Sequence, residues 1–584
     1  MPDEGNLKKV DASQRPDSQS QVRVYAIPPS ENAQAVDIVQ GFLEALTSDD
    51  PDFAIARKYL TKEASDSWDP QHSTTVLADG PNTVADNVDN DSGSGRTYSL
   101  TGRQIATVNK QHAYVPDETS YAQTVHLSQQ NGSNGRVWRI DRLPKGVVLG
   151  ESDFERNYEA VNKYYFAEPE AGHEGSGPKA LVADPIYVRQ RIDPLTQTVK
   201  SLLAGPTHWL GPVVTSPFLM GTRLAPGTKS LTPDDKNKLV VPLNGRADRV
   251  DQKRCTLMAA QLLFTLQDLT SSGVEQVELR RQNGSQLCVL GKDRAETVAS
   301  HRGPGRPSYQ YFVDDKQRLV QMPVNAGSNA KPEPVPGPFG SPEQELRSAA
   351  ISRDEQHAAG VSADGRSLYT ASLVSGSLGG PELRSRSKSA GDGLSTPSWD
   401  GRGDLWVADR DPKRPRLFWL DQGTGEPVPV NVSGLDGHIK DVRVSADGVR
   451  IALLVEKKGR TSLRIGRVER SVGKDEQPII SVVEPREAAP QMEEVTAMSW
   501  AGPSRLVVVG RESGGVQQMR YVQCDGSAPA GATLPGLTGV KEIAASEDET
   551  QPLLAHSDDG IVRLPSGAQW QTVGKDGRAP VYPG

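Results

Sequence analysis

The sequence predicts a multidomain protein in which two α+β domains are followed by an all-β propeller. At 584 residues the chain is longer than one hydrophobic core usually organises, so several domains are expected. Helical periodicity is confined to the first half, where it alternates with strand-like segments. The second half carries an internal repeat of short apolar runs and Gly, Asp and Ser turns instead.

The predicted first domain spans 23–150 and follows a flexible tether at 1–22, which holds no apolar cluster. Apolar residues at three- and four-residue steps predict one helix with a single buried stripe, made of Val36, Val39, Leu43 and Leu46. A second helix is expected to begin at Asp50-Pro51, an N-cap followed by proline at the first helical position. Strands are then expected at 97–109, 121–129 and 136–143.

The predicted second domain spans 151–300. A strand at 180–191 leads into a helix at 192–206, which Asp193 caps and Gly205-Pro206 ends. The remaining elements expected here are a strand at 238–245, a mostly apolar helix at 251–273 and a hairpin at 274–290 around Asn283-Gly284.

The three cysteines are Cys255, Cys288 and Cys524, and none belongs to the CxxC pair of a zinc site. A Cys255–Cys288 bridge is expected if the protein works in an oxidising compartment, and buried free thiols are expected otherwise.

The predicted propeller spans 301–584 and contains five copies of one strand–turn–strand element. Each copy ends a short strand on a serine, and consecutive serines lie 46, 47, 54 and 47 residues apart: Ser352, Ser398, Ser445, Ser499 and Ser546. Two positions later four copies carry a turn aspartate, at Asp354, Asp400, Asp447 and Asp548, whereas one copy has Ala501. A period near 45 residues with several strands is typical of propeller blades.

Five copies and a strand-like segment at either end favour six blades, with five or seven as alternatives. We expect strands from the end segments, 309–322 and 560–573, to join and remove the free edges. Trp399 and Trp500 occupy the same register of the repeat and are expected to pack between blades. The Pro-rich segment 331–343 is expected to be an extended blade connection.

Composition and motifs exclude several classes of function. The net charge of −8 disfavours a nucleic-acid partner. No apolar run approaches the ~18 residues of a membrane helix, and the first residues lack the apolar core of a signal peptide. The sequence contains no P-loop, HExxH or GxSxG motif. We therefore assign no catalytic, cofactor-binding or metal-ligating residue, and we expect no cofactor.

Three groups of residues remain to be interpreted: two aspartates, the isolated histidines and two basic segments. Asp404 and Asp409 would ligate a divalent cation only if their strand pointed them inward, as in a propeller hydrolase or lactonase. The isolated histidines are expected to be structural or solvated: His208, His301 and His438. The basic segments 382–388 and 410–417 are expected in connections between blade strands, either solvated or in contact with an acidic patch on a partner.

The order of these units resembles a known family. The run LVADPIYVRQRIDPLTQTVKSLLAGP, with KLVVPLNG and QKRCTLMAAQLLFTL after it, resembles the GerMN domain of spore-germination and sporulation proteins. Residues 31–150 are similar, more weakly, to the cystatin-like sheets of the nuclear transport factor 2 superfamily. With YFVDDKQRLV, EPVPGPFG and a propeller following, essentially the full length resembles the actinobacterial lipoprotein LpqB family.

The resemblance implies a non-enzymatic accessory lipoprotein, lipid-anchored on the extracytoplasmic face of the cell membrane. It implies binding to the extracytoplasmic domain of the sensor kinase MtrB, partner of the response regulator MtrA, and effects on cell-envelope homeostasis, division and sporulation. The chain has no leader and no lipobox cysteine, so we expect Met1 to replace a removed leader and this form to be soluble. We expect a monomer, and a cell-wall glycan-binding module is a further alternative.

Overall fold

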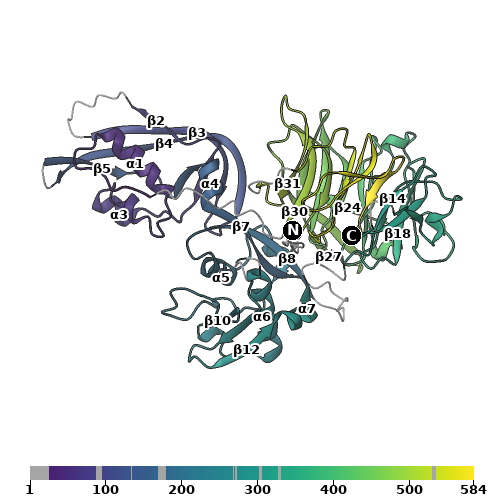
Figure 1. The fold of residues 1–584 in the computed structure, drawn as a ribbon, viewed down its shortest axis with the longest axis horizontal. Helices are drawn as coiled ribbons and strands as arrows, with labels where there is room; N and C mark the ends of the chain where they lie inside the picture. Colours follow the sequence, from purple (N-terminus) through teal and green to yellow (C-terminus); the bar gives the residue numbers. More distant parts are fainter. Residues whose placement is uncertain are drawn as a thin grey trace, which may run out of the picture. The chain divides into compact units, whose positions relative to one another are not determined.

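The computed structural model describes residues 25–86, 95–132, 135–168, 179–267, 269, 273–300, 306–326, 330–528 and 534–584. The chain forms two compact units, one of 1–104 and 119–157 and the other of 105–118 and 158–584. The predicted fold class is confirmed: two α+β regions precede a propeller (Figure 1). The tether predicted at 1–22 and His301 lie outside the described residues, and the boundaries predicted at 22, 150 and 300 stay predictions.

The first unit is built on short helices and one antiparallel sheet with a parallel edge. Its helices are α1 (Ala35–Leu46), α2 (Ala54–Arg57), α3 (Lys62–Ser67) and α4 (Glu151–Asn157). The sheet order is β5-β4-β3-β1-β6 with β2 beside β3, where β1 is Thr74–Leu77, β2 Asn82–Ala85, β3 Gly95–Val108, β4 Tyr114–Gly132, β5 Gly135–Arg142 and β6 Val147–Gly150. Strands β3, β4 and β5 confirm the three predicted strands.

Two predictions for the first helices are wrong in detail. The buried face of α1 includes Ile38 and Phe42, and Val36 is 37% exposed, so the stripe is rotated from the predicted one. The second helix begins at Ala54 and not at Asp50-Pro51. The reason is local: the Asp50 carboxylate accepts hydrogen bonds from the backbone N of Asp52 (3.3 Å) and Ile55 (2.9 Å), which stabilises a turn before the helix.

The described residues of the GerMN-like region, 158–300, form two small sheets and three helices. One sheet runs β13-β8-β7-β9, with β7 Tyr158–Ala167, β8 Lys179–Arg189, β9 Val214–Thr215 and β13 Ala299–Ser300. The other runs β10-β11-β12, with β10 Lys238–Pro242, β11 Gln276–Arg280 and β12 Gln286–Gly291. The helices are α5 (Pro194–Ala204), α6 (Gln252–Leu266) and α7 (Lys292–Val298), and 3-10 turns occur at Gly211–Val213 and Gly245–Ala247.

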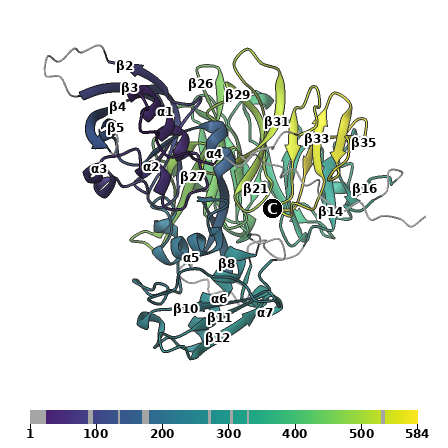
Figure 2. The same cartoon turned by 60° about the vertical axis from the view of Figure 1, so that its left-hand side comes forward.

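Helix α6 is the centre of this region and contacts strands of both sheets, β7 as well as β11 and β12 (Figure 2). Its residues from Met258 to Leu266 are all buried, as the mostly apolar sequence predicts. The cap of α5 is also confirmed, because Asp193 accepts a hydrogen bond from Thr196 N at 3.1 Å. A disulfide joins Cys255 of α6 to Cys288 of β12, so the bridged alternative is the correct one for these two cysteines. Cys524 is free and buried.

The propeller consists of consecutive sets of antiparallel strands. The first three sets are β17 (Leu346–Ile351), β18 (His357–Ser362), β19 (Ser367–Ser372), β20 (Leu383–Arg384); β21 (Ser398–Trp399), β22 (Leu405–Asp409), β23 (Arg416–Leu420), β24 (Val428–Val432); and β25 (His438–Val444), β26 (Arg450–Lys457), β27 (Arg460–Val472), β28 (Pro478–Glu487). The next are β29 (Glu494–Trp500), β30 (Arg505–Arg511), β31 (Gln517–Gln523); β32 (Glu542–Ala544), β33 (Leu553–Ser557), β34 (Gly560–Leu564), β35 (Gln571–Gly574); and β36 (Arg578–Val581), β14 (Tyr309–Val313), β15 (Leu319–Pro323), β16 (Glu333–Pro334). The number of blades stays a prediction, because β24 pairs with β28 and joins two sets into one sheet.

The first strands of these sets form a closed ring, in which each contacts the next: β17, β21, β25, β29, β32 and β36. We call them the inner strands. The two ends of the propeller pair through β14 and β36, where Tyr311 lies opposite Val581, and the chain colours meet there in Figure 1. The predicted joining of the ends is therefore confirmed. The joining strand is Arg578–Val581, however, whereas 560–573 supplies β34 and part of β35.

Arg450 of β26 links the propeller to the GerMN-like region and is 1% exposed. Its guanidinium donates to four groups: the carboxylate of Asp447, the carbonyl oxygens of Ala183 (3.2 Å) and Pro503, and Cys524 Sγ (3.4 Å). It also lies over the ring of Trp500, 5.3 Å from its centroid. Around this group one apolar core continues from α6 of the GerMN-like region to β26 and β30 of the propeller.

The disulfide is expected to contribute to stability, because a bridge across a sequence separation of 33 residues restricts the unfolded chain. The variant Cys255→Ala/Cys288→Ala should lower the free energy of unfolding by about 3 kcal/mol, measured by denaturant titration. Reductant should move the parent protein to the same midpoint and leave the double variant unchanged. Equal midpoints for oxidised parent and variant would contradict the role.

Replacing Arg450 by Met should lower the free energy of unfolding by about 3–5 kcal/mol, because Asp447 would keep a buried charge without its partner. Adding Asp447→Asn to that variant should recover part of the loss. As a control, Arg460→Met removes an Arg that is 73% exposed and should cost less than about 1 kcal/mol. A cost for Arg450→Met no larger than this control would show that the buried link is unimportant.

Candidate functional site: the inner strands and the basic edge

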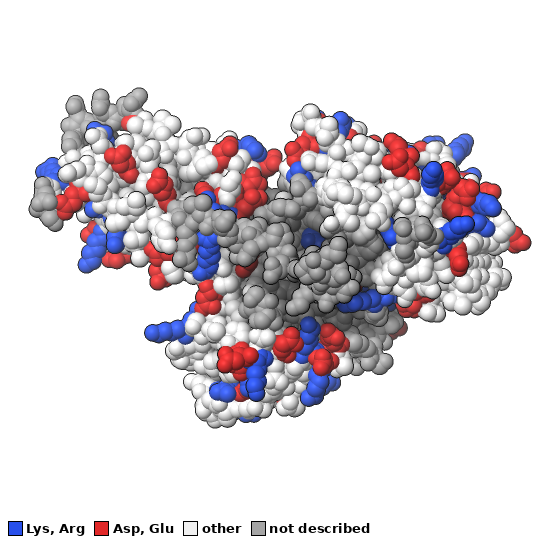
Figure 3. Space-filling view, viewed as in Figure 1, with Lys and Arg blue, Asp and Glu red and all other residues white. Residues whose placement is uncertain are grey.

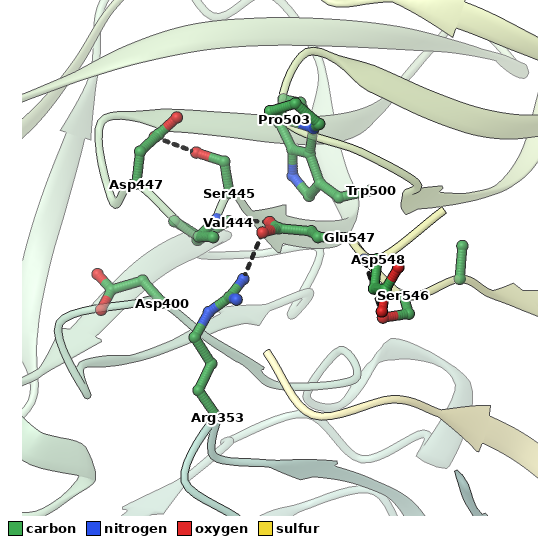
Figure 4. Close-up of polar contacts among 12 residues, drawn as sticks. Arg353, Asp400, Val444, Ser445, Asp447, Trp500, Pro503, Ser546, Glu547 and Asp548 are labelled. Carbon is green, nitrogen blue, oxygen red and sulfur yellow. Dashed lines mark hydrogen bonds and ion pairs between the residues drawn. The ribbon is translucent and has the colours of Figure 1, made fainter. Parts of the chain in front are cut away.

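Three of the five repeated serines build turns with the aspartate two positions later, as predicted. Ser352 Oγ donates to Asp354 Oδ1 at 2.6 Å, and Ser445 Oγ donates to Asp447 in the same way (Figure 4). In the copy that contains Ser546, the serine Oγ accepts from the backbone N of Asp548 at 3.1 Å. Asp354 and Asp447 also accept hydrogen bonds from the backbone N of Gln356 (3.0 Å) and Val449 (2.9 Å), so these contacts stabilise tight turns.

The other two serines tie neighbouring inner strands together instead. Ser398 Oγ accepts from Val444 N and Ser499 Oγ accepts from Ala545 N, each at 3.0 Å. The two tryptophans predicted to pack between blades do so. Trp399 Nε1 donates to Ala350 O at 3.2 Å, and Trp500 Nε1 donates to Arg443 O at 3.1 Å, so each indole reaches an adjacent set of strands.

A small cavity of about 50 Å³ lies where the inner strands end, and we call it the narrow end of the channel. Arg353 and Glu547 face each other there, with Arg353 Nη2 at 2.9 Å from Glu547 Oε2 (Figure 4). Glu547 also accepts from Ala446 N at 2.7 Å. Burial raises the pKa of Glu547, and the positive charge of Arg353 opposes that rise. The two charges of the pair therefore offset each other at this end.

Asp404 is 2% exposed and lies next to Asp400 in the turn between β21 and β22. Burial, and after it the negative charge of Asp400, raises the pKa of Asp404 to about 7. Arg470 opposes this rise, since its Nη2 lies 2.9 Å from Asp400 Oδ2 and 3.8 Å from Asp404 Oδ2. Asp404 also accepts a hydrogen bond from Gln422 N at 3.2 Å. Arg470 and this backbone group therefore fix the positions of the carboxylates.

Asp409 does not lie with Asp404 in a ligand set. Its Oδ1 accepts from Ser385 Oγ at 2.6 Å, and its Oδ2 pairs with Arg416 Nη2 at 3.2 Å. Among the described residues, no group of three or more His, Cys, Asp or Glu side chains is placed to hold a metal ion. His208 and His438 are exposed and lie in separate parts of the second unit.

The Ser385–Asp409–Arg416 contacts bring the two basic segments side by side. Residues 410–415 connect β22 to β23, as predicted, but Leu383–Arg384 forms the outer strand β20, so the first segment is not purely a connection. In it, Ser385 and Ser387 are buried, whereas the alternating basic residues Arg384, Arg386 and Lys388 are exposed. We define the basic edge as the exposed basic residues of both segments: Arg384, Arg386, Lys388, Lys413 and Arg414.

Sequence reasoning missed the charged groups that face the channel, above all Arg353 and Glu547. They come from different copies of the repeat, at position +1 relative to the repeat serine in each. That shared position was a signal for an inward-facing pair, because equivalent positions of successive copies meet at the same end of the ring.

Comparison with known proteins places these features in a family. Three family models match: Lipoprotein LpqB, N-terminal domain, at 28–155; Sporulation and spore germination at 163–288; and Lipoprotein LpqB beta-propeller domain at 318–583. A "Lipoprotein LpqB" of Streptomyces avermitilis is 58% identical over 587 residues, covering 100% of this chain and 95% of the relative. That of Streptomyces coelicolor is 56% identical with the same coverage, and that of Mycobacterium tuberculosis is 27% identical over 94% of this chain and 91% of its own.

Solved structures are similar only in part. TolB from Acinetobacter baumannii covers 53% of this chain and 84% of its own at a TM-score of 0.32 and 14% identity. A chain of a nidogen/laminin complex covers 47% of this chain and 97% of its own at a TM-score of 0.35 and 10% identity.

The raised pKa of Asp404 predicts a pH-dependent stability. The folded value of about 7 lies above the ordinary 3.8, so the protonated carboxyl favours the folded state and this contribution is lost as the pH rises from about 4 to about 7. At about 1.4 kcal/mol per pKa unit, the loss is at most about 4 kcal/mol. Asp404→Asn should flatten the pH profile of the free energy of unfolding over that range.

The exposed Asp475→Asn is the matched control and should keep the parent profile. A parent protein whose stability is constant from pH 4 to pH 7, or an Asp404→Asn variant with an unchanged slope, would contradict the assignment.

Proposed function

The chain belongs to the lipoprotein LpqB family, and on this premise we propose that it is a non-enzymatic accessory lipoprotein that binds and modulates the sensor kinase MtrB on the extracytoplasmic side of the cell membrane. The full-length match at 58% identity is the evidence for the family. The basic edge is the observation that supports the proposed mode of binding. In the native precursor, a lipid anchor before the first unit would hold the protein at the membrane. Among the described residues, none of the helices is both long and apolar enough to cross a bilayer.

A binding role fits the chemistry of the second unit. The serines of the repeat hold turns or tie strands, and the carboxylates of Asp400, Asp404 and Asp409 are occupied by arginines and backbone groups. What the unit offers a partner is a rigid surface, because the GerMN-like region and the propeller share one apolar core. A rigid surface loses little conformational freedom on binding, which favours recognition of a folded partner.

The basic edge is the surface best suited to such a partner. Most charges on the face shown in Figure 3 are interspersed, with acidic and basic side chains next to each other. The basic edge instead presents three exposed cations at every second residue of one short segment, Arg384, Arg386 and Lys388, with Lys413 and Arg414 on the adjoining connection. Hydrogen bonds from Ser362 and from Arg366 N lower the pKa of Asp364, and the charge of Arg384 lowers it further, so this carboxylate offsets part of the local charge. The chemistry of the edge fits an acidic patch on the partner.

The test is binding of the chain to the purified extracytoplasmic domain of MtrB, measured by surface plasmon resonance at several salt concentrations. The triple variant Arg384→Glu/Arg386→Glu/Lys388→Glu should weaken binding at least tenfold at low salt, mainly through the association rate, because steering by exposed charges acts on encounter. Salt should weaken binding of the parent more than binding of the variant.

The control Lys253→Glu/Arg294→Glu/Lys474→Glu changes the charge equally at exposed positions away from the basic edge and should bind like the parent. Absence of binding by the parent chain, in solution and with the kinase in membranes, would refute the partner. Equal weakening by both triple variants would refute the basic edge as the docking site.

A further inference from the structure

The inner strands enclose a second, larger cavity of about 230 Å³, which we call the wide end of the channel. It is lined by residues near the beginnings of the inner strands, whereas the narrow end is lined by residues near their ends. Both cavities share Thr396, Arg443, Ile543 and Pro580, so they are consecutive parts of one channel.

Cations dominate the wide end. Five basic residues from four sets of strands line it: Arg347, Arg410, Lys440, Arg443 and Lys541. Two acidic residues, Asp441 and Glu542, also line it, and both already interact with neighbouring protein groups. Asp441 pairs with Arg443 at 3.0 Å, and Glu542 accepts from His556 Nδ1 and from Ala579 N, each at 2.8 Å. Five positive charges against two negative ones leave a formal excess of three.

Arg347 and Arg410 are the least neutralised of these cations. Arg410 donates to the carbonyl oxygens of Gly393 and Leu394, each at 3.1 Å, and Arg347 donates to that of Ala390. Within the part of the chain that is described, neither forms an ion pair with a carboxylate. Burial lowers the pKa of Arg410, and the charge of Arg347 lowers it further, whereas the charges of Asp441 and Asp392 act in the opposite direction.

Lys440 and Lys541 are arranged differently. Their ammonium groups pair with Glu456 (2.8 Å) and Asp558 (3.1 Å), which lie outside the cavity lining, and all four side chains are at least one-third exposed. Such exposed pairs are weak, so both lysines remain available to a ligand in the channel. Leu454, Met498 and Ile543 supply an apolar part of the wall, where a bound anion would be partly shielded from water.

We propose that the wide end of the propeller channel binds a small anion carrying two or more phosphate or carboxylate groups, held by Arg347 and Arg410 and supported by Lys440 and Lys541. The planar guanidinium matches the geometry of both kinds of oxyanion. The cavity of about 230 Å³ is smaller than the ~300–1,000 Å³ of sites for drug-sized ligands, so it fits an anion of the size of pyrophosphate or citrate. This site is separate from the basic edge, and the proposal does not rest on binding to the kinase.

The test is isothermal titration calorimetry of the full chain at low ionic strength, with inorganic pyrophosphate and citrate as probes and sodium chloride at matched ionic strength as the blank. Saturable binding of at least one probe is expected. The variant Arg347→Gln/Arg410→Gln should weaken it about tenfold or more, because it removes two charge-assisted donors. Binding of pyrophosphate alone identifies a phosphate site, and binding of citrate alone identifies a carboxylate site.

The control Arg384→Gln/Arg386→Gln removes the same charge from the basic edge and should bind the probes like the parent. If Arg347→Gln/Arg410→Gln does not fold, as judged by circular dichroism, the exposed pair Lys440→Gln/Lys541→Gln replaces it and should weaken binding about threefold. No saturable heat with either probe, unchanged affinity in the channel variants, or equal weakening in the control overturns the proposal.

Discussion

The buried guanidinium of Arg450 is the interaction on which the second unit depends. A charge at 1% exposure is stable only if its donors are satisfied, and here the acceptors come from both sides of a domain junction. Ala183 belongs to β8 of the GerMN-like region, whereas Asp447 and Pro503 belong to the propeller. Asp447 also accepts from Ser445 and from Val449 N, so one carboxylate holds both the repeated turn and the junction. The junction therefore cannot shift without breaking a turn of the propeller.

Closure of the ring has a second consequence, which is that its two ends differ chemically. Because the inner strands are brought into one ring by the pairing of β14 with β36, residues at the same position of each set gather at the same end. At the narrow end this brings Arg353 to Glu547 and cancels their charges. At the wide end it brings Arg347, Lys440 and Lys541 to the same cavity, each five positions before the repeat serine of its set, and like charges accumulate there. The fold thus places an offset charge pair at one end and an excess of basic residues at the other.

Local signals carried most of the fold that could be predicted from the sequence. The capped start of α5 and the serine–aspartate turn of the repeat each depend on residues a few positions apart, and both are present in the structure. Prediction failed where a short local contact competed with a pattern, as at Asp50, or where partners lie far apart in the chain, as for Arg450 and Ala183. The candidate site also depends on partners that lie far apart in the chain. The charge balance at the channel is set by which copies of the repeat meet, and no single copy contains that information.

Active sites also contain carboxyl groups whose pKa is raised by a second carboxylate, as at Asp404. Whether such a group can react depends on whether a ligand can reach it. Neither Asp400 nor Asp404 lines the narrow or the wide end of the channel. Trp406 Nε1 donates to Asp400 at 3.1 Å and Arg470 covers both carboxylates, so packing of the strand set seals the pair from any ligand in the channel. The perturbed carboxyl is therefore a consequence of folding. Arg347 and Arg410, in contrast, line the wall of the wide end, where a ligand in the channel would reach them.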